Sequence, residues 1–151
     1  MTNSEKAKLI YERGYNCCQS VLSTYGPEYK LDTDNCLRLA SGFAAGMAYQ
    51  GKTCGAVIGA YLVIGLLKGS SIPNDEYSKE TVYRTISDFN SEFTKINQSL
   101  ECRELLKKDV SQADDLDFII RHKLFEINCP KYVEDAGRIL DKLLNKYKNG
   151  E

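Results

Sequence analysis

Apolar residues recur every three to four positions along most of the chain, and this spacing predicts helices. In the first segment, Ile10, Cys17 and Val21 follow this period. The predicted helices span Ser4–Tyr25, Thr33–Met47, Cys54–Lys68, a segment capped by Asn74 or Asp75 and running to Asn97, Leu100–Lys108, Asp117–Ile127, and a last helix that begins at Asn128-Cys129-Pro130. No segment shows the sustained alternation of a strand. The 151 residues therefore predict an all-α fold, a single compact domain of about five to seven helices over residues 1–151.

One predicted helix differs from the others because it is apolar nearly all round. It begins at Cys54 and continues through the glycine- and alanine-rich run GAVIGAYLVIGLL. A helix without a polar face is expected at the centre of a domain. Gly55 and Gly59 are four residues apart and would let another backbone or a bulky ligand come close.

Composition and charge exclude several classes of partner. The chain is 42% hydrophobic and 27% charged, with a formal net charge of −1. Because there is no long basic run, we expect no nucleic-acid partner. The longest apolar run, Ala56–Leu67, is shorter than the ~20 residues of a membrane span, and the N-terminus has no apolar signal-peptide core. We therefore expect a cytoplasmic protein without membrane insertion.

The six cysteines are the candidate chemistry. In a chain without a secretion signal, free thiols, a metal or redox chemistry are favoured over structural disulfides. Cys54, Cys102 and Cys129 each fall within one turn of a predicted helix N-terminus, where backbone N–H groups and the helix dipole would lower a thiol pKa. Cys17 lies on the apolar side of the first predicted helix and could meet the other three. Spacing alone is equally compatible with buried structural thiols.

Three stretches of the chain resemble a known family. They are GYNCCQSVL at Gly14–Leu22, ASGFAAGMAYQGKTCGAVIGA at Ala40–Ala60, and CRELL at Cys102–Leu106, followed by Cys129 ahead of KYVEDAGRIL. Together they resemble the C_GCAxxG_C_C family of redox-active proteins over nearly the whole chain. By this resemblance the family cysteines are Cys17, Cys54, Cys102 and Cys129. Two departures are Cys18, where the family has a small residue, and FAAGM, where the family favours glycines.

The resemblance implies that the four cysteines form one metal site holding an iron–sulfur cluster, 2Fe-2S or 4Fe-4S. Gly55 and Gly59 would be the cofactor-binding glycines that leave room for it. Such a protein would transfer electrons to a redox partner protein or sense redox state, rather than act as an enzyme on its own substrate. Whether Cys17 or Cys18 is the ligand, and whether the chain forms a homodimer, remain open from sequence.

Three alternatives use the same residues differently: a metal-free thiol–disulfide protein, a structural zinc site with four thiolates, and a plain helical interaction module. Tyr49 and Tyr61, near the central glycines, are candidates to shield a site. His122, the only histidine, lies between Arg121 and Lys123 and is expected in solvent.

Overall fold

The computed structural model describes residues 1–148, and this part of the chain is helical with no strand. The helices are α1 (Asn3–Glu12), α2 (Cys17–Tyr25), the 3-10 turn η1 (Gly26–Tyr29), α3 (Thr33–Leu39), α4 (Gly55–Lys68), α5 (Glu76–Asn97), α6 (Cys102–Leu105), α7 (Ala113–Arg121) and α8 (Leu124–Lys148). The predicted all-α fold is confirmed. The described residues form eight α-helices instead of five to seven, because the first predicted helix is divided in two.

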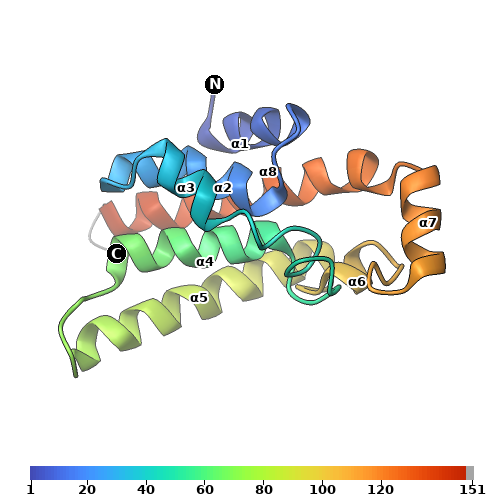
Figure 1. Cartoon of the computed structure of the whole chain (residues 1–151). Coiled ribbons are helices and arrows are strands. Elements are labelled where there is room, and N and C mark those ends of the chain that lie inside the picture. The colour runs from blue at the N-terminus through green and yellow to red at the C-terminus, as the bar shows by residue number, and fades with distance from the viewer. Residues whose placement is uncertain (149–151) are drawn as a thin grey trace.

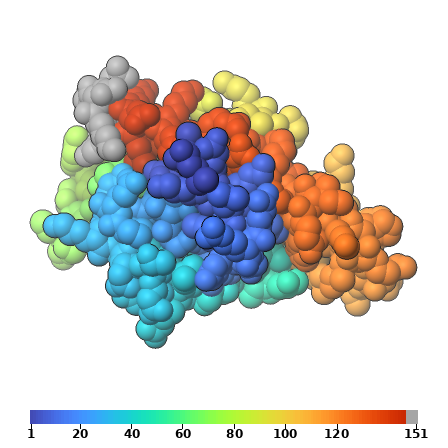
Figure 2. All heavy atoms as spheres, turned by 90° about the horizontal axis from the view of Figure 1, so that it is seen from above, coloured from blue at the N-terminus to red at the C-terminus, as the bar shows by residue number. Residues whose placement is uncertain are grey.

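α4 lies at the centre of the fold, as its apolar sequence predicts (Figure 1). α2, α5 and α8 pack against it, and α8 also contacts α2 and α5. Ala56, Val57, Ala60 and Val63 of α4 are fully buried. α1 lies across α2 and α8 on the outside of this bundle, and α7 projects at one end (Figure 2). No helix among residues 1–148 combines the length and apolar character that a membrane crossing requires.

The first predicted helix, Ser4–Tyr25, is interrupted at Gly14. Gly14 has a φ of +107°, a conformation that side chains disfavour, so the chain turns there. Asn16 then caps α2: its side chain accepts from the Gln19 N–H at 2.8 Å while the Gln19 side chain accepts from the Asn16 N–H at 3.0 Å. Cys17 is therefore the first residue of a helix and not, as predicted, part of a helix interior.

The second predicted helix, Thr33–Met47, ends at Leu39, and residues 40–54 form a loop. Within it, Ala45–Tyr49 all have positive φ between 50° and 72°. Hydrogen bonds inside the loop hold this left-handed turn, from Tyr49 N–H to Ala44 O at 3.1 Å and from Lys52 N–H to Gly46 O at 3.0 Å. In SGFAAGM, Gly46 is buried, residues 43–45 are half-buried and the others are exposed. Its apolar spacing thus belongs to a partly buried loop, not to a helix.

The C-terminal helices also differ from the prediction. The short helix after Ser99 covers only Cys102–Leu105, and the helix predicted over Asp117–Ile127 ends at Arg121. α8 begins at Leu124 and continues through Pro130, which was predicted to start the helix. Cys129 therefore lies inside α8 and not at its N-cap.

Candidate metal centre

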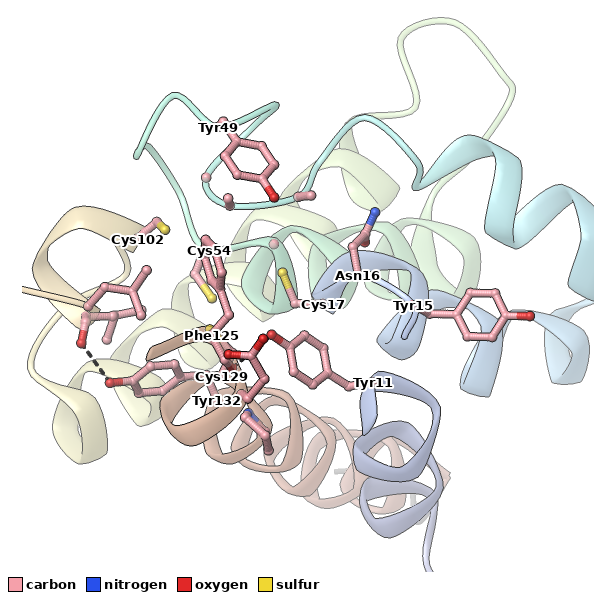
Figure 3. Close-up of a pocket in the computed structure, with 18 of the residues that line it drawn as sticks. Tyr11, Tyr15, Asn16, Cys17, Tyr49, Cys54, Cys102, Phe125, Cys129 and Tyr132 are labelled. Atoms are coloured by element: carbon pink, nitrogen blue, oxygen red, sulfur yellow. Dashed lines mark hydrogen bonds between the residues drawn. The ribbon is translucent and has the colours of Figure 1, made fainter. Parts of the chain in front are cut away.

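A cavity of about 430 Å³ opens at the end of the bundle where α2 and α4 begin. All four family cysteines line it: Cys17 from α2, Cys54 from the N-cap of α4, Cys102 from α6 and Cys129 from α8 (Figure 3). None of the six cysteines of the chain forms a disulfide. Four thiols separated by long stretches of sequence are thus brought to one cavity.

Glycine brings Cys17 close to the start of α4. A Cβ atom at Gly55 would collide with the Cys17 sulfur and would lie 2.6 Å from the Phe43 carbonyl oxygen. Real Cβ atoms do not approach neighbours this closely, so only glycine fits. Gly55 also lines the cavity. Its role is to admit the Cys17 thiol beside Cys54.

A short backbone pairing holds Cys54 next to the segment of Cys102. Thr53 and Glu101 form an isolated antiparallel bridge. On either side of it, Cys54 N–H donates to Leu100 O at 2.8 Å and Cys102 N–H donates to Lys52 O at 2.7 Å. These bonds fix the two cysteines relative to one another, although 48 positions separate them in the chain.

Tyrosine hydroxyls anchor the wall that carries Cys129. Tyr11 of α1 donates to the Phe125 carbonyl at 3.0 Å and so links α1 to α8 one turn before Cys129. Tyr132 donates to the Leu105 carbonyl at 2.9 Å, linking α8 to α6. Both rings line the cavity and lie beside Cys129 in Figure 3.

The left-handed loop forms the remaining wall. Ala44, Ala45, Gly46 and Tyr49 line the cavity, and the Tyr49 ring meets Phe125 edge-on with 6.0 Å between ring centroids. Gly46 lies against the Cys102 side chain, since a Cβ there would be 2.8 Å from that of Cys102. The loop therefore packs over the thiols.

Burial dominates the electrostatics of the four thiols. It raises the pKa of Cys17 and Cys54 and is the largest cause for both. Backbone N–H groups at the start of α4, from Ala56 and Val57, lower the Cys54 pKa but do not outweigh burial. Neutral thiols are therefore favoured in the metal-free protein.

The two other thiols follow the same rule. Burial, followed by the nearby Cys17, raises the pKa of Cys102 to about 12. Burial and then Cys17 also raise the pKa of Cys129, with the Tyr11 hydroxyl acting in the opposite direction. The N–H groups at the start of α4 lower the Cys54 pKa as expected. The pKa values of all four thiols are nevertheless raised overall, because the cost of desolvating a thiolate exceeds the effect of a few N–H groups.

The remaining candidates lie away from the cavity. Gly59 contacts α2, where a Cβ would be 2.9 Å from the Val21 Cβ, so its position serves helix packing. Cys18 is fully buried in the core and does not line the cavity. Tyr61 bonds Asn90 on α5 instead of shielding the site. His122 is exposed, as expected, and stacks on Phe118.

Sequence reasoning missed the aromatic part of this site. Tyr11, Phe125 and Tyr132 all line the cavity, yet in the sequence each occupies an ordinary apolar position of a helix. No local motif distinguishes a tyrosine whose hydroxyl faces a cavity from one that packs in a core. For Tyr49 the nearness to the central glycines was a usable signal.

A family model described as "Putative redox-active protein (C_GCAxxG_C_C)" matches residues 15–143. The chain belongs to this family. The match includes all four cysteines of the cavity, whereas Tyr11 and the rest of α1 precede it. No curated protein matches the chain, and no solved structure matches it either. The C_GCAxxG_C_C assignment supports a redox-active protein.

Proposed function

We propose that this C_GCAxxG_C_C protein binds an iron–sulfur cluster through Cys17, Cys54, Cys102 and Cys129, and that it transfers electrons or senses redox state. The observation that carries the proposal is the convergence of these four cysteines on one cavity. Four cysteine ligands are the common set for both 2Fe-2S and 4Fe-4S centres.

The side chains around the cavity fit such a group. Thiols line it on several sides, and the other lining residues are largely small or aromatic, with glycines at 14, 46 and 55. Among residues 1–148, no group of three or more His, Cys, Asp or Glu side chains is arranged to hold a metal ion. The four thiols therefore supply the ligand type and number that a cluster needs, not a preformed metal geometry.

Protonation affects how a metal would enter. Because burial raises the pKa values of all four thiols, binding would release their protons as metal–sulfur bonds form. Backbone N–H groups from Ala45, Cys18 and Ala56 lower the pKa of Cys17, and the same groups would stabilise negative charge on its sulfur in the bound state.

When bound, the cluster supplies a one-electron redox centre. The chain's own residues would hold it through thiolates and stabilise its charge through backbone N–H groups. A redox partner protein would then deliver or accept the electron.

The test is iron and acid-labile sulfide content, with a visible spectrum, on protein purified without air. We expect coloured protein whose iron is lost in single serine variants of Cys17, Cys54, Cys102 and Cys129. Cys18→Ser and Cys36→Ser are matched controls because both thiols are buried elsewhere, and both should keep iron. Loss of iron in Cys18→Ser but not in Cys17→Ser would contradict the assignment of Cys17.

The alternatives predict different outcomes in the same samples. Colourless protein with one zinc per chain would select the structural zinc site. Protein without metal in which two of the four cysteines form a reversible disulfide would select the thiol–disulfide function. A metal-free protein with no redox change would leave a helical interaction module.

A further inference from the structure

We propose that Glu12 and Glu126 form an entry site for divalent metal cations. The two carboxylates lie where a surface groove adjoins the thiol cavity, and they draw the cation from solvent toward the four cysteines. This role rests on the proposed function, because the thiols are the destination of the metal. It does not depend on the identity of the centre, since a cluster and a single zinc ion both take up their metal as cations.

The position of the pair follows from two neighbouring hollows. A surface groove of about 540 Å³ is lined only by residues of α1 and α8. Glu12, Glu126 and Pro130 line this groove and also line the thiol cavity. These three residues therefore mark the place where the groove and the cavity adjoin. Both glutamates are exposed to solvent there, whereas Pro130 is buried.

The two glutamates come from different helices. Glu12 is the last residue of α1. Glu126 precedes Cys129 by three residues in α8, and side chains at this spacing lie on the same face of a helix. A cation held at the junction is therefore one helical turn from the first cysteine that it would meet.

The charges on the cavity wall determine the sign of what enters. Among the described residues that line the cavity, Glu12 and Glu126 are the charged ones, and no Lys, Arg or His lies with them. A cleft lined by one sign of charge attracts ions of the opposite sign, and its low-dielectric walls focus the field. The cavity therefore favours a cation and disfavours an anionic substrate.

Basic residues of the neighbouring groove do not cancel these two charges. Each of them pairs with Glu134 or Asp135 at 2.7–3.3 Å: Lys8, Lys131 and Arg138. Among the described residues, neither Glu12 nor Glu126 has such a basic partner in the groove. The junction thus keeps two carboxylates that are available to a cation.

The buried thiols show that the cation is a metal ion. Cys54 and Cys102 are each only 7% exposed and line the same cavity. Thiolates are preferred by zinc and by iron in clusters, whereas carboxylates suit harder ions. Two carboxylates at the mouth therefore hold such a metal less tightly than four thiolates inside, and the ion moves on to the cysteines.

Loading exchanges protons for metal. Each metal–sulfur bond forms as one S–H bond breaks, the protons leave to solvent, and no electron is transferred. A Co(II) ion bound by four thiolates carries a net negative charge, which the carboxylates repel. Glu12 and Glu126 therefore speed the approach of the free cation without strengthening the loaded state.

The test is the rate of Co(II) uptake by reduced, metal-free protein without air, followed by the absorption band of cobalt–thiolate bonds. Glu12→Gln and Glu126→Gln each remove one charge at nearly constant size. Glu80→Gln is the matched control, because this exposed residue of α5 lines neither hollow and its loss changes the net charge equally.

At low ionic strength, we expect uptake about threefold slower in each single variant and about tenfold slower in the double variant. Glu80→Gln should match the wild type. Added salt should narrow the differences, because it screens exposed charges. The Co(II) affinity, measured by competition with a chelator, should be as high in the double variant as in the wild type or higher.

Equal uptake rates in the wild type and the double variant overturn the entry site. Equal slowing in Glu80→Gln also overturns it, since net charge alone would then explain the rate. A weaker Co(II) affinity in the double variant overturns it too, because the carboxylates would then be ligands or supports of the fold. Wild-type protein that takes up no Co(II) has the same consequence.

The iron and sulfide assay tests the proposed function separately. Co(II) uptake that depends on Glu12 and Glu126, in protein that assembles no iron–sulfur cluster, supports the entry site and refutes the cluster. A cluster that forms in protein whose Co(II) uptake ignores both carboxylates supports the proposed function and refutes the entry site.

Discussion

Replacing Gly55 by alanine tests whether close packing at the start of α4 creates the four-thiol cavity. The new Cβ would collide with the Cys17 sulfur and would lie 2.6 Å from the Phe43 carbonyl oxygen and 3.3 Å from the Cys18 nitrogen. Two of these three neighbours are backbone atoms, which cannot rotate away as a side chain can. The substitution must therefore move α4 away from α2 and the loop, or displace the Cys17 side chain.

The expected size follows from two opposing effects. Overpacking of this kind destabilises proteins by about 1–3 kcal/mol, while alanine favours helix over glycine by up to about 1 kcal/mol. Gly55 is the first residue of α4, where the helix preference counts least. We expect a net loss of about 2 kcal/mol in the free energy of unfolding, or a Tm lower by about 4–8 °C for a chain of this size.

Gly65→Ala is the matched control in the same helix. No atom lies within 4 Å of a Cβ built at Gly65, so only the helix preference remains and stability should rise by up to about 1 kcal/mol. Urea unfolding of the two variants and the wild type measures both changes, and the iron assay shows whether Gly55→Ala also disturbs the site. If Gly55→Ala were as stable as Gly65→Ala and retained wild-type iron, the packing argument would be refuted.

Three further predictions use the same assays. Gly59→Ala should lower the free energy of unfolding by about 1–2 kcal/mol, because the new Cβ would lie 2.9 Å from the Val21 Cβ. Iron content should be unchanged in this variant, and a loss of iron would place Gly59 at the site. Burial raises the pKa of Cys102 from 9.0 to about 12. The stability that the neutral Cys102 thiol contributes is therefore complete below pH 9 and is lost as pH rises from 9 toward 12. The urea midpoint should fall over this range, and it should fall less steeply in Cys102→Ser. Ala45→Gly should leave stability unchanged or raise it by up to about 1 kcal/mol, because Ala45 has a φ of 50°, which costs an alanine about 1–2 kcal/mol. A clearly lower Tm in thermal unfolding would show that this strain is absent.

Elements with strong local signals could be predicted from sequence. α5 begins and ends close to the predicted residues, because Asp75 supplies a side-chain cap that accepts from Ser78 N–H at 3.1 Å. α4 is central as predicted, since a helix apolar on all sides has no stable place at a surface. In both cases the information lies within one helix and its ends.

The predicted helix boundaries were wrong where two local sequence signals conflicted. The apolar spacing predicted one helix that continues across Gly14. Asn16 and Gln19, however, form a capping box, which marks the start of a new helix. Proline is common at the first position of a helix, but α8 includes Pro130 in its interior. The left-handed residues 45–49 have no sequence signal beyond Gly46.

The sequence by itself determined an all-helical chain, a central apolar helix and the order of four family cysteines. The tertiary structure decided that Cys17, and not Cys18, faces the cavity, because the start of α2 is set by the Asn16 cap. The tertiary structure also decided whether the thiols are neutral or ionised. A thiol at a helix start is activated when water reaches it and kept neutral when buried, and burial depends on how α1, α6, α8 and the loop close over the cavity. That closure joins residues more than a hundred positions apart, such as Tyr11 and Phe125, and no local pattern encodes it.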